Sequence, residues 1–178
     1  ILKPFDSCPQ LCVYCQRNWE VTSLDQARVR SDALDKAIDW IRRRASITEV
    51  LVTGGDPVTL DDRRLGRIIE SLAAIGHVER IRIGTRVPVT MPCRITSAFV
   101  SMLGRHHVPG RRELCVVTHV ESPRELTPDL RDAVTRIRRA GISVFNQQVF
   151  TYYNSRRFET AFLRRKLRLC GIEPYYTF

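Results

Sequence analysis

The chain has 178 residues, 43% of them hydrophobic and 27% charged, which suits one folded domain and excludes a disordered protein. Its 29 basic and 19 acidic residues give a formal net charge of +10, but the arginines are scattered and no basic run alternates with aromatic residues, which disfavours a nucleic-acid surface. No apolar stretch approaches the roughly 20 residues of a membrane span and no secretory signal is visible, so we expect a cytoplasmic protein outside the membrane.

Six short runs have the length and composition of β-strands. Several of them are almost entirely apolar, which is typical of strands buried in a parallel sheet. The predicted strands cover residues 1–5, 49–53, 80–84, 113–118, 143–150 and 172–176.

Five amphipathic segments separate these strands and predict helices. Thr59 and Asp62 form a capping-box pattern before the second helix, and Thr96 and Thr127 are expected to cap the third and fourth. The expected apolar positions are Leu34, Ile38 and Ile41 in the first helix, Leu65, Ile68, Ile69 and Leu72 in the second, Phe99, Val100 and Leu103 in the third, Leu130, Val134 and Ile137 in the fourth, and Phe158, Phe162, Leu163 and Leu167 in the fifth.

This alternation of strands and helices predicts an α/β fold with a parallel sheet built from right-handed crossovers. Periodicity alone allows either a doubly wound open sheet or a curved partial (β/α)6 barrel of the TIM type. The polar candidate residues all follow the carboxyl ends of predicted strands, which form the active face of parallel barrels, so we favour the partial barrel. We expect residues 1–178 to form this one domain within a longer protein, because the chain has no initiator Met and stops in a strand-like segment.

Three of the six cysteines lie close together just after the first predicted strand. Cys8, Cys12 and Cys15 have the spacing Cys-x3-Cys-x2-Cys, which suits three ligands of a [4Fe–4S] cluster and leaves the fourth iron open for a substrate or cofactor. A zinc site normally has a fourth Cys or His nearby, whereas the nearest histidine in sequence is His77. An iron–sulfur or zinc module for binding or electron transfer remains the alternative, with its fourth ligand among Cys93, Cys115 and Cys170, which otherwise read as small apolar residues.

The cysteine spacing, with Tyr14 before the last cysteine, resembles the radical S-adenosylmethionine (SAM) superfamily. The resemblance implies a partial (β/α)6 barrel in which SAM binds the open iron and is cleaved reductively to a 5′-deoxyadenosyl radical that abstracts hydrogen from a substrate. Gly54, Gly55 and Asp56 after the second strand are similar to the superfamily's Gly-Gly-Glu motif, with the aspartate used by the lysine 2,3-aminomutase group. Beside a radical enzyme acting on an amino acid and a metal-binding module, a basic radical enzyme that modifies RNA is a third hypothesis.

Further segments resemble the lysine 2,3-aminomutase-like (KamA-type) family in particular and extend over essentially the whole chain. The resemblance implies an amino acid 2,3-aminomutase-like isomerase acting on an amino-acid-type substrate. These segments are 81–88, 92–96, Thr118-His119, Asn146-Gln147 and Pro174-Tyr175-Tyr176.

The same resemblance implies roles for individual residues. Arg17 would bind the substrate carboxylate, and Arg86 would face the SAM carboxylate or another anion. Pyridoxal phosphate (PLP) would be a further cofactor of an aminomutase, but its lysine is not in this chain. The implied partner is an electron donor such as flavodoxin or ferredoxin. Whether the chain forms a homo-oligomer is left open. The implied cluster ligands are Cys8, Cys12 and Cys15, and the implied SAM-binding residues are Tyr14, Gly54, Gly55, Asp56, Arg86, His119 and Gln147.

Overall fold

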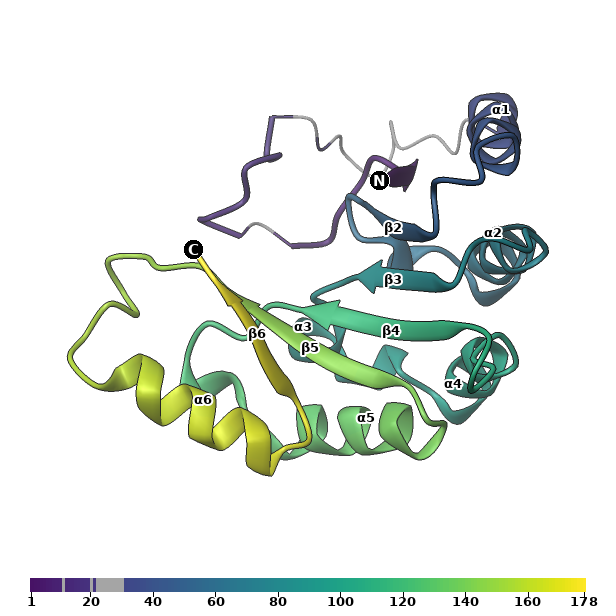
Figure 1. Ribbon diagram of the computed structural model, residues 1–178. Helices are drawn as coiled ribbons and strands as arrows, with labels where there is room; N and C mark the ends of the chain where they lie inside the picture. The colour runs from purple at the N-terminus through teal and green to yellow at the C-terminus, as the bar shows by residue number, and fades with distance from the viewer. Residues whose placement is uncertain (11, 20, 22–30) are drawn as a thin grey trace.

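A single sheet of six parallel strands organises the computed structural model shown in Figure 1, which describes residues 1–10, 12–19, 21 and 31–178. The strands pair in chain order from β1 to β6, so each crossover moves one position in the same direction. A doubly wound sheet would reverse this order part-way, so the structure confirms the partial barrel. The strands are β1 (Leu2–Phe5), β2 (Glu49–Gly54), β3 (Arg80–Gly84), β4 (Glu113–Thr118), β5 (Ser143–Gln148) and β6 (Glu173–Thr177).

The helices lie along the outer side of the curved sheet and leave its inner side open (Figure 1). The core lies between them, where Val52, Ile83 and Val116 of the strands belong to the same buried cluster as Leu65 and Ile137 of the helices. No helix in the described part of the chain is long and apolar enough to span a bilayer. The helices are α1 (Ser31–Arg42), α2 (Asp62–Ala73), α3 (Val87–Thr90), α4 (Ser97–Gly104), α5 (Pro128–Arg139) and α6 (Glu159–Leu169), with short 3-10 turns at Pro57–Thr59, Pro92–Arg94 and Pro123–Glu125.

The helix caps predicted at Thr96 and Thr127 are present. The hydroxyl oxygens of Thr96 and Thr127 accept hydrogen bonds from the backbone N–H three residues ahead, at 3.1 and 3.2 Å. The predicted capping box of Thr59 and Asp62 is wrong, because Asp61 caps α2 by accepting a hydrogen bond from the Arg64 N–H at 2.8 Å. Thr59 instead ends the preceding 3-10 turn.

The apolar face predicted for α6 is only partly correct. Leu163 and Leu167 are buried, but the side chains of Phe158 and Phe162 are 71% and 43% exposed. Phe158 does not continue the helix, because its backbone is left-handed with φ 63° and directly precedes α6. The helical spacing of Phe158 and Phe162 therefore predicted that both side chains would be buried, and in the structure neither is.

Candidate active site

The residues predicted for the site come together at the carboxyl edge of the sheet. The cysteine loop, residues 8–15, follows β1 and lies on the side of the sheet where β2, β3 and β4 end (Figure 1); its residue 11 is outside the described residues. Asp56 follows β2, Arg86 follows β3 and His119 follows β4, while Gln147 lies near the end of β5. Neighbouring parallel strands end at one edge, so five separate segments deliver polar groups to the same face.

Gly54 and Gly55 allow the end of β2 to lie directly against the segment that leads into the cysteine loop. The Gly55 N–H donates to the Phe5 carbonyl at 2.8 Å, and the Asp56 N–H donates to the Ser7 carbonyl at 3.1 Å. Gly54 has a φ of 132°, which side chains rarely tolerate, and a Cβ on Gly55 would lie 1.8 Å from the Ser7 oxygen. The glycine pair therefore fixes the backbone immediately before Cys8.

The Asp56 carboxylate joins the ends of β2 and β3. It is 2% exposed and accepts hydrogen bonds from the Val58 N–H at 3.0 Å, the Thr85 hydroxyl at 2.7 Å and the Arg86 N–H at 2.8 Å. Burial raises the pKa of Asp56, and these hydrogen bonds partly oppose that shift. The carboxylate is therefore occupied by the protein itself and positions the start of Arg86.

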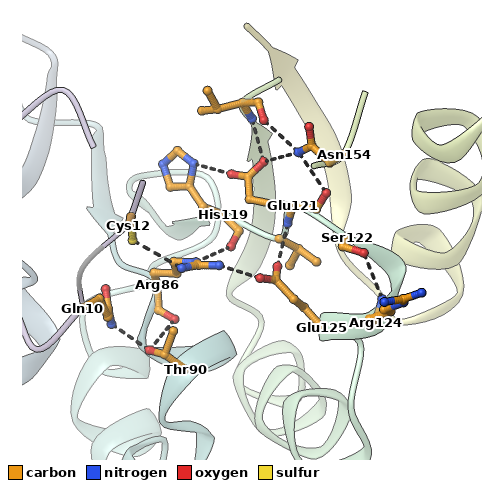
Figure 2. Close-up of polar contacts among 12 residues, drawn as sticks. Gln10, Cys12, Arg86, Thr90, His119, Glu121, Ser122, Arg124, Glu125 and Asn154 are labelled. Atoms are coloured by element: carbon orange, nitrogen blue, oxygen red, sulfur yellow. Dashed lines mark hydrogen bonds and ion pairs between the residues drawn. The ribbon is translucent and has the colours of Figure 1, made fainter. Parts of the chain in front are cut away.

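Arg86 connects the cysteine loop to the segment after β4 (Figure 2). Its Nη1 donates to the Cys12 sulfur at 3.3 Å, its Nη2 pairs with the Glu125 carboxylate at 2.5 Å, and its Nε donates to the His119 carbonyl at 3.2 Å. The guanidinium carbon also lies 5.4 Å from the centre of the Tyr14 ring. This guanidinium is therefore oriented by three polar contacts and an aromatic ring.

Glu121 and Glu125 belong to a hydrogen-bond network that holds the guanidinium of Arg86 in place. Glu125 accepts the Glu121 N–H at 2.7 Å, and the Glu121 carboxylate accepts the Val149 N–H at 2.8 Å (Figure 2). Asn154 donates to the carbonyls of Glu121 and Val149 at 3.1 and 2.9 Å, and His119 Nδ1 lies 3.5 Å from a Glu121 oxygen. Sequence analysis missed Glu121, Glu125 and Asn154. The one signal was two acidic residues shortly after a strand in an arginine-rich chain.

The three cysteines and the residues beside them fit an iron–sulfur cluster that also binds a polar ligand. Cys8, Cys12 and Cys15 are all free thiols and all partly buried. Beside them, the Tyr14 hydroxyl is buried without a hydrogen-bond partner, as expected where a polar ligand would supply one, whereas His119 Nδ1 faces the Glu121 oxygen 3.5 Å away. The described residues contain no group of three His, Cys, Asp or Glu side chains already gathered around a metal position.

Cys8 is expected to react slowly with iodoacetamide in the metal-free protein. Burial raises the pKa of its thiol from 9.0 to about 11, and the nearby Asp56, Cys12 and Cys15 act in the same direction. Only the thiolate reacts, so alkylation at pH 8 should be about 100-fold slower than for a thiol of pKa 9, and should rise about tenfold per pH unit until the pKa is reached. Mass spectrometry of the Cys8 peptide measures this rate. A rate that levels off near pH 9 would contradict the shift.

Arg17 and Gln147 are the two further predicted residues, and both are partly buried. Arg17 lies just after the cysteine loop, and Gln147 lies near the end of β5. Cys115, in contrast, is buried within β4, away from the strand end.

Comparison with known proteins places these features in one family. No family model matches the chain. It is 45% identical over its whole length to an uncharacterised KamA family protein of Methanocaldococcus jannaschii, covering 28% of that protein. It is 35% identical over its whole length to glutamate 2,3-aminomutase of Clostridioides difficile, covering 41%, and 34% identical over 97% of its length to L-lysine 2,3-aminomutase of Methanococcus maripaludis, covering 39%.

The chain belongs to the KamA-like family. It spans between 28% and 41% of the length of these three KamA-like relatives. The shared segment therefore corresponds to a partial α/β barrel whose carboxyl edge carries the cysteine loop, Asp56, Arg86 and His119.

Proposed function

We propose that this chain is the radical SAM core of an amino acid 2,3-aminomutase. The observation that carries the proposal is the meeting of three free thiols with the Gly54–Asp56 turn, Arg86 and His119 at one edge of the sheet. Relatives named glutamate and L-lysine 2,3-aminomutase support the reaction class. When bound, a [4Fe–4S] cluster and SAM would together supply a radical able to remove hydrogen from the substrate.

Different residues of the chain would bind the cluster and SAM. Cys8, Cys12 and Cys15 would hold three irons as thiolates. In the Gly54–Asp56 turn, the N–H groups of Gly55 and Asp56 are already donated to the segment before the cysteine loop, so what the turn can offer a ligand is its carbonyl oxygens. Carbonyl oxygens accept hydrogen bonds from an ammonium group, which fits the amino end of SAM.

The remaining roles concern the rest of SAM and the substrate. His119 and Gln147 would contact SAM, with Tyr14 beside them. Arg17 would bind the carboxylate of an amino acid substrate, because a guanidinium presents paired donors that match a carboxylate. A one-electron donor such as flavodoxin or ferredoxin would reduce the cluster, and PLP would be supplied to a lysine outside this chain.

Anaerobic reconstitution with iron and sulfide tests the proposal. After dithionite reduction, we expect an EPR signal of a [4Fe–4S]+ cluster that changes when SAM is added, together with 5′-deoxyadenosine. Lysine and glutamate, each with and without PLP, should then be assayed for the 3-amino product. Cys12→Ser should lose the cluster, whereas Cys93→Ser, at an exposed position in the Pro92–Arg94 turn, should keep it.

The alternative classes give different results. A cluster whose EPR signal ignores SAM would favour an electron-transfer module, and bound zinc without a cluster would contradict the enzyme. An RNA-modifying enzyme would show RNA binding that weakens steeply with salt.

A further inference from the structure

We propose that Arg86 and Glu125 act as a charge pair that sets the reduction potential of the cluster held by the cysteine loop. The inference rests on the proposed function. It adds a role for two residues that contact or support a cluster ligand, and it gives a function to Glu125, which no motif had singled out.

The first step is the contact between Arg86 and Cys12. The Nη1 atom donates to the Cys12 sulfur at 3.3 Å, and the Arg86 side chain is only 17% exposed, so solvent and salt screen its charge weakly. Hydrogen bonds to cluster sulfurs, net charge and solvent exposure are among the properties that set the potential of an iron–sulfur cluster. Reduction adds a negative charge to the cluster, so a cation donating to one of its sulfurs favours the reduced state and raises the potential.

The second step is the position of Glu125 on the opposite side of the guanidinium. Its carboxylate pairs with Nη2 at 2.5 Å, and its other oxygen accepts the backbone N–H of Glu121 at 2.7 Å. Glu125 therefore holds the guanidinium in place and at the same time partly cancels its charge (Figure 2). The two residues should act on the potential with opposite signs.

The backbone keeps this arrangement fixed. Asp56 accepts the Arg86 N–H, and the Arg86 Nε donates to the His119 carbonyl. The backbone of Arg86 is thus held by Asp56 after β2, and its guanidinium by His119 and Glu125 after β4, independently of the sulfur. A fixed charge of this kind acts on the cluster without reorganisation when an electron arrives.

A redox titration followed by EPR, on the reconstituted holoprotein without SAM or substrate, tests the pair. Arg86→Gln should lower the potential, reducing the ratio of reduced to oxidised cluster at a given potential about tenfold, which is about 59 mV for a one-electron couple. Glu125→Gln should raise the potential, because the guanidinium then acts uncompensated. Arg80→Gln is the matched control: Arg80 also pairs with carboxylates, those of Glu49 and Glu113, but at the amino end of β3. Its potential should equal that of the wild type.

Opposite shifts in the two variants, with no shift in the control, are the expected result. Equal potentials in all proteins, or shifts of the same sign, would overturn the pair's role while leaving the cluster and the proposed function intact. Should Arg86→Gln fail to assemble a cluster, Glu125→Gln still decides, since a potential at or below the wild-type value contradicts the inference. A wild-type protein that assembles no cluster would overturn the proposed function itself.

Discussion

Replacing Gly55 by alanine is expected to lower the free energy of unfolding by more than about 3 kcal/mol and to prevent cluster assembly. The new Cβ would lie 1.8 Å from the Ser7 carbonyl oxygen and 2.4 Å from its carbon. Both are backbone atoms, so no side chain can rotate away to relieve the contact. The segment before Cys8 must shift instead, and the hydrogen bonds from Gly55 to Phe5 and from Asp56 to Ser7 break with it.

Urea denaturation measures the loss of stability, and the iron content after reconstitution measures the effect on the cysteine loop. Gly76→Ala is the matched control, because a Cβ at Gly76 would meet nothing within 4 Å. Its free energy of unfolding should change by no more than about 1 kcal/mol, and its iron content should equal that of the wild type. A Gly55→Ala protein with wild-type stability and iron content would show that the glycine is not needed for this contact.

The fold could be predicted from the sequence because each of its determinants is local. Apolar runs predicted six strands whose ends agree with the structure within two residues, and the largest difference is at β5, which was predicted to reach residue 150 and ends at Gln148. Polar residues after the strands favoured the partial barrel over the doubly wound sheet, and the sequential strand order confirms it. The error at Phe158 and Phe162 has the same origin, since local spacing does not show whether a partner covers a helix face.

The supporting contacts of the site could not be predicted, because they join residues far apart in the chain. The Asp56 carboxylate meets the N–H of Arg86, and Arg86 meets Glu125, across three different strand ends. Glu121 and Glu125 follow a strand in an arginine-rich chain, but their spacing alone does not distinguish them from surface residues. The Gly-Gly motif was expected to face a ligand, and the structure adds that its N–H groups hold the backbone before the cysteine loop.

Asp56→Ala is expected to lower the free energy of unfolding by about 3 kcal/mol or more. The substitution leaves three donors without their acceptor at a site that is 2% exposed, namely the N–H groups of Val58 and Arg86 and the Thr85 hydroxyl. Each unsatisfied buried donor costs about 1–3 kcal/mol, although the Thr85 hydroxyl can rotate toward another acceptor. Asp56→Asn should lie between Ala and the wild type, because the amide keeps one acceptor oxygen but turns an NH2 group toward a donor.

Urea denaturation of the three proteins orders these effects, and Asp61→Ala supplies the comparison. Asp61 is also an aspartate that accepts a backbone N–H next to α2, but its side chain is 57% exposed. Losing that cap should cost only about 1 kcal/mol, because water can replace the acceptor. A stability loss for Asp56→Ala no larger than for Asp61→Ala would mean that the carboxylate does not hold the ends of β2 and β3 together. Asp56 would then remain available to a ligand, and the placement of Arg86 would have to depend on Glu125 and the His119 carbonyl alone.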